Sequence, residues 1–595
     1  MHSQTHSSRY GRLTIISCAP TQATDARLAA LARFCGLTPT GSESLGGEPD
    51  LECDALIASF AAFAQLTHAA RSQILDEERL VLLYAQEQQG CAAPDNLVGA
   101  LTQGALRGPS AISSSPLRVT LAQEMPPGCR QLRGLSFEIV PDQAGWRAFV
   151  PQVGSPALEP VVTLGGSPWL VRVRRAQGDL FLLAGGRALD LDAACSAAGI
   201  QPLQYLELLP WLIFMRTAGG EACWHNPNPR ACLLIDDPLL RPRYGYLDYH
   251  QLALAMDEHR FATSIAFIPW NYRRSQPRVA ALFHRRPGQF SLCVHGCDHT
   301  AGEFKRGSVA DLRDKSRLAQ TWMAAHRDAT GIEHEPIMIF PQGGFIKAAL
   351  QALDAEGYKA AINTSVLAAD WQVGDLTWRD LLEVAVTAYG GCPLFARWYP
   401  RDLFAIAFGV FVGKPAFVVE HHGYFKAGCE PLAAFVTRLS QQIEQLEWDS
   451  PGEIVNGAAL IKCAGPHERW LRFYTDDFVF KNSSSQAATY RLYRRLTNGE
   501  PTGLIHDNRP LDFELQGNDL VAQLTTEPGQ RVRIRLLRAK EPAWGPGPRR
   551  PPWYRAQVAS RRLLSELRDN YLSRSPWLLG QAKGLSAILQ RAAGL

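Results

Sequence analysis

Carboxylate and imidazole side chains follow short apolar runs at four places in the second half of this 595-residue sequence. Each run is four or five residues long, which is typical of a buried strand. The four ends read, in chain order, Asp236-Asp237, His295-Gly-Cys-Asp-His299, Pro341-Gln-Gly-Gly and Glu420-His421-His422. In a parallel α/β barrel the carboxyl ends of all strands meet at one rim. We therefore expect these polar groups to share one site.

Three of these side chains form a set that suits a metal ion. Asp237, His295 and His299 offer one carboxylate and two imidazoles, which is typical of a zinc site that keeps positions open for water and substrate. The His-x-x-x-His spacing places both rings on one side if a helical turn begins there. A structural alternative stays open, because buried histidines can satisfy hydrogen bonds without a metal and Asp-Asp-Pro can be a turn.

The elements that would position these residues alternate between strand and helix from about 230 to 445. Helical spacing of apolar residues predicts helices over 249–259, 309–327 and 348–357, and a strand over 263–268. Long connections between strands imply right-handed crossovers in a parallel sheet or barrel. The segment 230–445 is therefore predicted to be a (β/α) barrel.

The preceding residues read as a separate α/β domain over 1–200. Strands over 13–16, 54–58 and 79–84 alternate with a helix over 26–35, a βαβαβ order that indicates a small parallel sheet. The β-rich stretch over 179–183 resembles the closing hairpin of flavodoxin-like, glutamine-amidotransferase-like domains. A third class of function would place a reactive thiol here, at Cys91 or Cys18. An apolar helix over 201–217, within a linker segment 201–229, is expected to pack between this domain and the barrel.

Two further segments follow the barrel. Period-two alternation between Gly- and Asn-rich turns predicts an antiparallel β-sandwich over 450–540. Residues 541–595 comprise a Pro-rich linker and a basic helical tail. The tail offers two interpretations, peripheral contact with anionic lipid or docking on the protein itself. Its basic residues are Arg555, Arg561, Arg562, Arg568 and Arg574, and its expected apolar side is Leu563, Leu564, Leu567, Tyr571, Trp577 and Leu578.

Composition narrows the class of protein. The 61 basic and 57 acidic side chains nearly balance, and no nucleic-acid-binding motif appears, so no nucleic-acid partner is expected. The 13 cysteines are scattered and form no Cys-x-x-Cys pair, which favours a reducing compartment. The N-terminus has no secretory apolar core, and no apolar run reaches membrane-spanning length. We expect a cytoplasmic protein without a transmembrane segment.

The four strand ends together resemble the polysaccharide deacetylase family, the chitooligosaccharide-deacetylase-like carbohydrate esterases. The first, second and fifth motifs of that family match Asp236-Asp237, His295 to His299, and the stretch from Val419 to His421. The third motif lacks its Arg at Pro341, and the fourth keeps only Asp370-Trp371 of its Asp-x-x-Asp-Trp. The resemblance covers about 230–425.

This resemblance implies a role for each residue. Asp237, His295 and His299 would hold a divalent metal, most simply Zn²⁺. Asp236 would act as general base on the attacking water, and His421 would protonate the leaving amine, with His422 as second candidate. A backbone N–H in the loop 341–344 would stabilise the oxyanion, and Asp370 could orient the histidine. The family's Arg has no assigned position.

The implied function is a metal-dependent hydrolase that removes an N-acyl group, most simply acetyl, from a sugar or glycan precursor. The alternative is a non-catalytic carbohydrate-binding or scaffolding protein on the same barrel. In both cases the expected partner is a carbohydrate.

Overall fold

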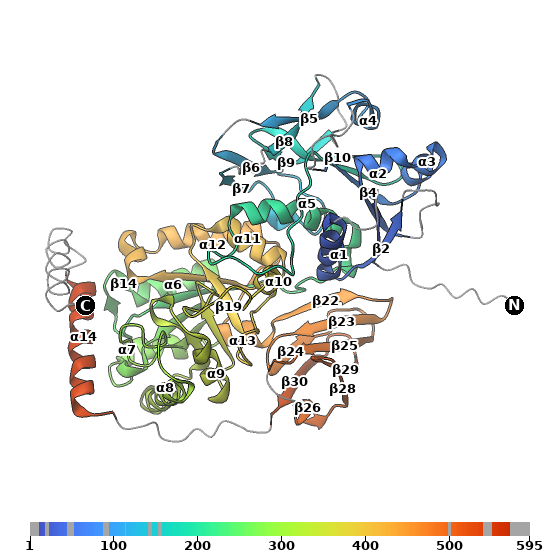
Figure 1. The fold of residues 1–595 in the computed structure, drawn as a ribbon. Coiled ribbons are helices and arrows are strands. Elements are labelled where there is room, and N and C mark those ends of the chain that lie inside the picture. The colour runs from blue at the N-terminus through green and yellow to red at the C-terminus, as the bar shows by residue number, and fades with distance from the viewer. Residues whose placement is uncertain are drawn as a thin grey trace.

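Seven parallel strands close into a barrel at the centre of the computed structural model (Figure 1). The structure describes residues 11–17, 23–43, 53–86, 95–112, 115–140, 146–152, 158–497, 501–538 and 550–571. Pairing of the first barrel strand with both the second and the last closes the ring. The strands are β12 (Arg230–Asp236), β15 (Thr263–Phe267), β16 (Phe290–His295), β17 (Glu335–Ile339), β18 (Ala360–Asn363), β19 (Leu394–Trp398) and β20 (Ala416–His421). The predicted (β/α) barrel is confirmed.

Helices follow the strands and cover the barrel, as the long connections predict. Their ends are set by local chemistry: Asp248 accepts from the first turn of α6, and Ser308 and Asp311 form a capping box on α8. The helices are α6 (Tyr249–His259), α7 (Pro277–His284), α8 (Val309–Thr330), α9 (Lys347–Ala355), α10 (Trp378–Leu382), α11 (Leu403–Phe411), α12 (Glu430–Gln442) and α13 (Pro451–Asn456). A short strand, β21 (Glu447–Trp448), pairs with the first two residues of β12. The two-residue strands β13 (Arg243–Tyr244) and β14 (Leu247–Asp248) form a small hairpin after β12.

The residues before the barrel form a nine-stranded mixed sheet in the order β2-β1-β3-β4-β11-β10-β9-β6-β7. The first five strands in this order are parallel and the rest antiparallel. The strands are β1 (Arg12–Ser17), β2 (Thr38–Glu43), β3 (Ala55–Ser59), β4 (Leu80–Tyr84), β6 (Leu117–Leu121), β7 (Ser136–Ile139), β9 (Leu158–Leu164), β10 (Ser167–Val173) and β11 (Leu180–Leu183). A separate pair joins β5 (Leu106–Ile112) to β8 (Trp146–Pro151). The helices are α1 (Ala23–Cys35), α2 (Phe60–Gln65), α3 (His68–Asp76) and α4 (Asp95–Leu101).

Helix α5 (Pro202–Gly219) joins this sheet to the barrel. Trp211 packs against Tyr84 of β4, with ring centroids 5.2 Å apart, and Tyr205 packs against Phe404 and Phe408 of α11. All residues from 206 to 215 are buried. The helix thus lies between the two bodies, as its mostly apolar sequence predicts.

After the barrel, two small sheets share one apolar core. The first has the order β22-β23-β25-β29-β28 and the second β24-β30-β26-β27. One pair, β23–β25, is parallel, so the expectation of purely antiparallel strands is wrong at this pair. The strands are β22 (Ala459–Cys463), β23 (Glu468–Phe473), β24 (Asp477–Lys481), β25 (Ala488–Arg495), β26 (Gly503–His506), β27 (Arg509–Pro510), β28 (Phe513–Gln516), β29 (Asp519–Thr526) and β30 (Arg531–Leu537).

The last described element is α14 (Pro552–Asn570), which packs beside the barrel in Figure 1. No helix among the described residues combines the length and apolar character needed to cross a membrane. The 11 cysteines within the described ranges are all free thiols, while Cys18 and Cys91 lie outside those ranges.

Candidate metal site

The barrel rim brings Asp237, His295 and His299 together. Oδ1 of Asp237 lies 3.3 Å from Nε2 of His295 and 3.1 Å from Nε2 of His299. This oxygen is buried and has no hydrogen-bonding partner of good geometry within the described residues. Three lone-pair donors that converge on one point, one of them otherwise unsatisfied, fit a divalent metal. No second cluster of three such ligands occurs in the described part of the chain.

Backbone geometry aims these side chains. Asp237 directly follows the last residue of β12 and has a φ of +81°, which is uncommon for a residue with a side chain. Its backbone N–H donates to the carbonyl of Ala266 on β15. The unusual backbone conformation turns the carboxylate of Asp237 away from the strand direction, and such local strain is typical of functional sites.

The loop from His295 to His299 is not the helical turn that the spacing suggested. Gly296 has a φ of +63° and His299 a φ of +56°, so the chain leaves β16 in a left-handed conformation. The buried carboxylate of Glu303 accepts the backbone N–H groups of Cys297, Asp298 and His299 at 3.1–3.3 Å. Hydrogen bonds to this carboxylate, rather than a helical turn, hold His299 where its ring faces Asp237. Burial, followed by the charge of Asp298, raises the pKa of Glu303 to about 8.

A hydrogen bond fixes the ring of His295. Its Nδ1 donates to the carbonyl of Ile339, the last residue of β17, over 3.0 Å. Because Nδ1 carries the proton, Nε2 presents its lone pair toward Asp237. This is the usual way in which an outer contact orients a metal-ligating histidine.

Asp236 lies next to this cluster and pairs with Arg397. Both of its oxygens accept from the guanidinium at 2.8 Å, and both side chains are almost fully buried. Burial alone would raise the pKa of Asp236, but the charges of Arg397 and His295 and the guanidinium hydrogen bonds hold it below its usual value. Arg397 stands on β19, a strand that the sequence analysis did not identify. It places a buried cation beside Asp236, and its sequence signal is a lone Arg inside an apolar run.

His421 ends β20, directly opposite Asp236 in the strand register. Its Nε2 lies 4.0 Å from Oδ2 of Asp236, and its side chain is 45% exposed, so it faces the mouth of the barrel. The expectation that Asp370 orients a histidine is wrong. Asp370 is exposed and accepts the backbone N–H of Lys347 at the start of α9.

His422, the second candidate acid, points elsewhere. Its Nε2 lies 3.5 Å from Oδ1 of Asp569 on α14, and its ring meets the edge of Tyr244. His422 therefore holds the terminal helix and makes no described contact with Asp236.

The turn after β17 was predicted to offer a backbone donor. The N–H groups of Gly343 and Gly344 donate within the turn, to the carbonyls of Phe340 and Pro341. Proline has no N–H, so Gln342 carries the remaining candidate donor. Gln342 has a φ of +56°.

Helix α14 lies against the same rim. The contacted loops follow β12, β15, β16 and β20, four of the seven barrel strands. Its contacts are Tyr554 with Asp298, Glu566 with Arg274, Asp569 with Tyr244 and His422, and Asn570 with the N–H of Gly245.

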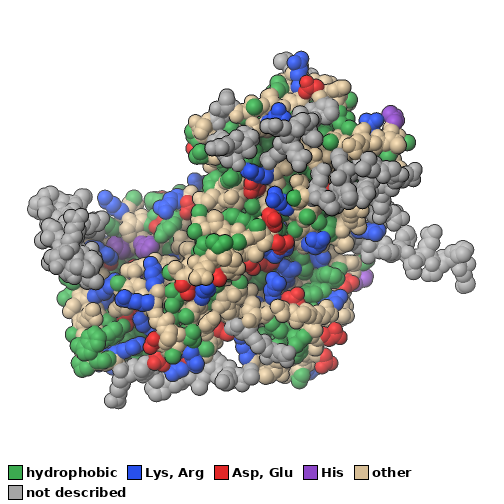
Figure 2. All heavy atoms as spheres, in the orientation of Figure 1, with side chains coloured by type: hydrophobic (Ala, Val, Ile, Leu, Met, Phe, Trp, Pro, Cys, Tyr) green, Lys and Arg blue, Asp and Glu red, His purple; other side chains and the backbone are tan. Residues whose placement is uncertain are grey.

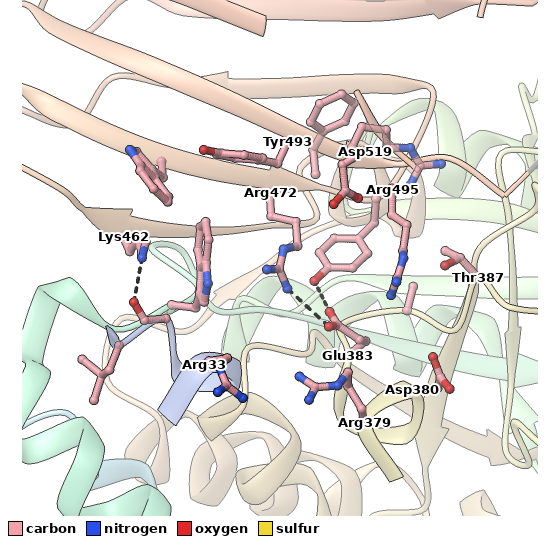
Figure 3. A pocket seen from close by; sticks show the side chains of 18 of the residues that line it. Arg33, Arg379, Asp380, Glu383, Thr387, Lys462, Arg472, Tyr493, Arg495 and Asp519 are labelled. Atoms are coloured by element: carbon pink, nitrogen blue, oxygen red, sulfur yellow. Dashed lines mark hydrogen bonds and ion pairs between the residues drawn. The ribbon is translucent and has the colours of Figure 1, made fainter. Parts of the chain in front are cut away.

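A cavity of 530 Å³ lies away from this rim, where α1, α10 and the sheet β22–β23–β25–β29 meet (Figure 3). Arg472 donates to Glu383 there, and Nζ of Lys462 donates to the carbonyl of Gly36 over 2.6 Å. None of its lining residues belongs to the predicted site. We regard it as a polar joint between the three parts of the chain.

No protein-family model and no curated protein matches this sequence. Solved structures similar to it include a CE4 family pseudoenzyme, a family 4 carbohydrate esterase and other deacetylases. A CE4 pseudoenzyme from Bacillus anthracis is 14% identical with a TM-score of 0.24, over 38% of this chain and 64% of that one, less than two thirds of its length. A mutant of that pseudoenzyme with restored enzymatic activity is 14% identical, with a TM-score of 0.25, and the match covers 39% of this chain and 68% of the mutant. A family 4 carbohydrate esterase from Bacillus anthracis is 12% identical, with a TM-score of 0.24, and the match covers 39% of this chain and 84% of the esterase.

Proposed function

We propose that this protein is a metal-dependent hydrolase that removes an N-acyl group, most simply acetyl, from a sugar or glycan precursor. The observation that carries the proposal is the grouping at one barrel rim of a three-ligand cluster, a buried carboxylate and an exposed imidazole. Asp237, His295 and His299 form the cluster, and Asp236 and His421 are the other two.

We assign the following roles to the residues at the rim. Asp237, His295 and His299 would hold the ion, most simply Zn²⁺, which when bound polarises an acyl carbonyl and lowers the pKa of water. The carboxylate of Asp236, kept ionised by Arg397, takes the proton of the attacking water. Nε2 of His421 gives a proton to the leaving amine nitrogen. The N–H of Gln342 is the candidate donor to the oxyanion.

The catalytic assignment predicts a sharp loss of acetate release. In Asp236→Asn and His421→Ala, the rate on an N-acetylated chitooligosaccharide should fall by about 10²-fold or more, since each removes a proton-transfer group. Asp370→Asn is the matched control and should retain its rate, because Asp370 only caps α9. Unchanged rates in both site variants would contradict the assignment.

The metal assignment predicts about one bound divalent ion per chain. Elemental analysis of protein purified without chelator should find it, and Asp237→Ala and His299→Ala should lose it. His422→Ala is the control that keeps the metal, because its ring contacts α14 instead. Metal retained in the first two variants would place the ion elsewhere.

The competing candidate is a non-catalytic carbohydrate-binding protein. The contacts of α14 with the loops at the rim support it, because they hold a helix beside the candidate site. Sugar binding that is insensitive to chelator, without acetate release, would establish this alternative.

The finer features predicted from the sequence belong to the same proposal. We infer that residues 1–200 form a flavodoxin-like domain, supported by the parallel order β2-β1-β3-β4-β11. Residues 201–229 would be the linker, 230–445 the deacetylase-type barrel, and 450–540 a β-sandwich. Residues 541–595 would make a peripheral membrane contact. A cytoplasmic location completes the proposal.

A further inference from the structure

Helix α14 buries charged side chains against the barrel and exposes its apolar side chains, the reverse of most helices docked on a protein. The side chains it buries against the barrel include Val558, Arg562, Glu566 and Asp569, three of them charged. Its large apolar side chains point outward instead. A docked amphipathic helix normally buries its apolar stripe, so the outward face needs another explanation.

The buried charges explain why the helix docks in this way. Glu566 forms a two-pronged ion pair with Arg274, with Nη2 2.7 Å from Oε2. Tyr244 donates its hydroxyl to Asp569 at 2.8 Å, and Asn570 accepts the N–H of Gly245 at the same distance. These directional contacts fix which face of the helix meets the rim, and thereby fix the apolar face outward.

The outward face concentrates exposed apolar surface. Half of the ten exposed large hydrophobic side chains in the described part of the chain belong to α14 or the residue after it. They are Trp553 (68% exposed), Leu563 (67%), Leu564 (65%), Leu567 (46%) and Tyr571 (69%). Leucines lie in the middle and an aromatic ring lies at each end, an arrangement suited to the boundary between lipid headgroups and acyl chains.

The exposed charges of α14 have one sign. Arg561 and Arg568 lie beside the apolar side chains, Arg555 is exposed on another side of the helix, and both acids are buried, with Arg568 also donating to Asp569. Hydrophobic and basic side chains lie side by side at the left edge of Figure 2, where Figure 1 places α14. Arginines beside an apolar stripe, with no exposed carboxylate on the helix, complement an anionic lipid surface.

We propose that α14 docks the molecule on an anionic membrane with the barrel rim close to the lipid, and that the substrate is an N-acetylated sugar joined to a lipid anchor. The docking part stands on α14 alone, whereas the substrate part rests on the proposed hydrolase. The contacts of α14 with the loops after β12, β15, β16 and β20 place the candidate site beside the docking face.

Docking is tested with the full chain and no sugar. Co-sedimentation should show binding to vesicles of phosphatidylcholine with phosphatidylglycerol, and about tenfold or more weaker binding to phosphatidylcholine alone. The triple variant Leu563→Ser/Leu564→Ser/Leu567→Ser should lose binding to both. Leu515→Ser is the matched control, since Leu515 is 41% exposed on β28. Absence of wild-type binding, or equal binding by the triple variant, would overturn the inference.

Two alternatives to a membrane could cover the apolar face, and each would give a different experimental result. A second copy of the chain would give a dimer in light scattering that the triple variant lacks. If residues 572–595 of the same chain covered the face, the protein would bind vesicles only after these residues were removed. Either result overturns the membrane assignment.

The substrate part is tested by comparing one N-acetylated sugar in two forms, free in solution and attached to a long alkyl chain in anionic vesicles. Wild type should release acetate faster from the vesicle-bound form, and the triple variant should lose that advantage while retaining activity on the soluble sugar. Equal rates on both forms would overturn the lipid-linked substrate. No release from either form, with vesicle binding intact, would overturn the proposed hydrolase and its substrate while supporting membrane docking.

Discussion

At the scale of single residues, Arg397 forms a buried ion pair with Asp236 in the site. It neutralises Asp236 inside the barrel, where an uncompensated carboxylate is costly. The same contact keeps the carboxylate ionised and fixed in orientation. A general base with both oxygens anchored is well positioned, although its lowered pKa makes it a weaker proton acceptor.

Replacing Arg397 by Met should therefore lower the free energy of unfolding by about 3–5 kcal/mol at pH 8, as for other broken buried pairs. Without the cation the pKa of Asp236 rises, so the loss should be smaller at pH 5 than at pH 8 because the buried carboxyl takes up a proton more readily. Urea unfolding at both pH values measures this.

Two control variants distinguish the loss of the ion pair from a general disruption of the barrel. Asp236→Asn/Arg397→Met should be more stable than Arg397→Met alone, because it removes the unpaired charge. Arg401→Met, whose side chain is 77% exposed, should change stability by no more than about 0.5 kcal/mol. A destabilisation that the double variant does not relieve would argue against the buried pair.

At the scale of an element, β17 carries a half-buried carboxyl, Glu335, at its first residue. Burial raises the pKa of Glu335 to about 7. Gly452 of α13 leaves room for it, since a Cβ at Gly452 would lie 2.7 Å from Oε1. Helix α13 is therefore packed against an acid that prefers to be neutral.

This acid should make stability fall as pH rises. The unfolded chain releases the proton near the ordinary value of about 4.3, whereas the folded chain retains it up to about 7, so deprotonation favours unfolding between these values. Glu335→Gln should remove this slope and exceed wild type by up to about 3 kcal/mol at pH 8. Thermal unfolding from pH 4 to pH 8 tests it, and parallel curves for both proteins would contradict it.

At the scale of the whole molecule, α14 is joined to the barrel mainly by polar contacts. Glu566→Gln weakens the pair with Arg274, so the helix should open more often and its amides should exchange with deuterium faster over 552–570. Gln557→Ala, on the exposed side of the same helix, is the control. Unchanged exchange in Glu566→Gln would mean that other contacts hold the helix.

Features that depend on local pattern could be predicted from the sequence, whereas features that depend on distant partners could not. Helix α6 and strand β16 follow from spacing within the segment, and the residues of the metal cluster follow from strand ends. Strands β18 and β19 are short and were not recognised, and Arg397 was missed with them. The conformation from His295 to His299 depends on Glu303 and Gly296, which spacing alone does not reveal. The docking face of α14 depends on Arg274 and Tyr244, far earlier in the chain.

The closure of the barrel between its first and last strands sets an order of assembly during synthesis. The three candidate ligands emerge from the ribosome by the end of the loop after β16. Arg397 and His421 follow with β19 and β20, and only then can β12 complete its pairing. Helix α14 emerges later still. A nascent chain that folds from its N-terminus therefore presents its ligands before the barrel closes, so an ion can be acquired before the helix covers the rim.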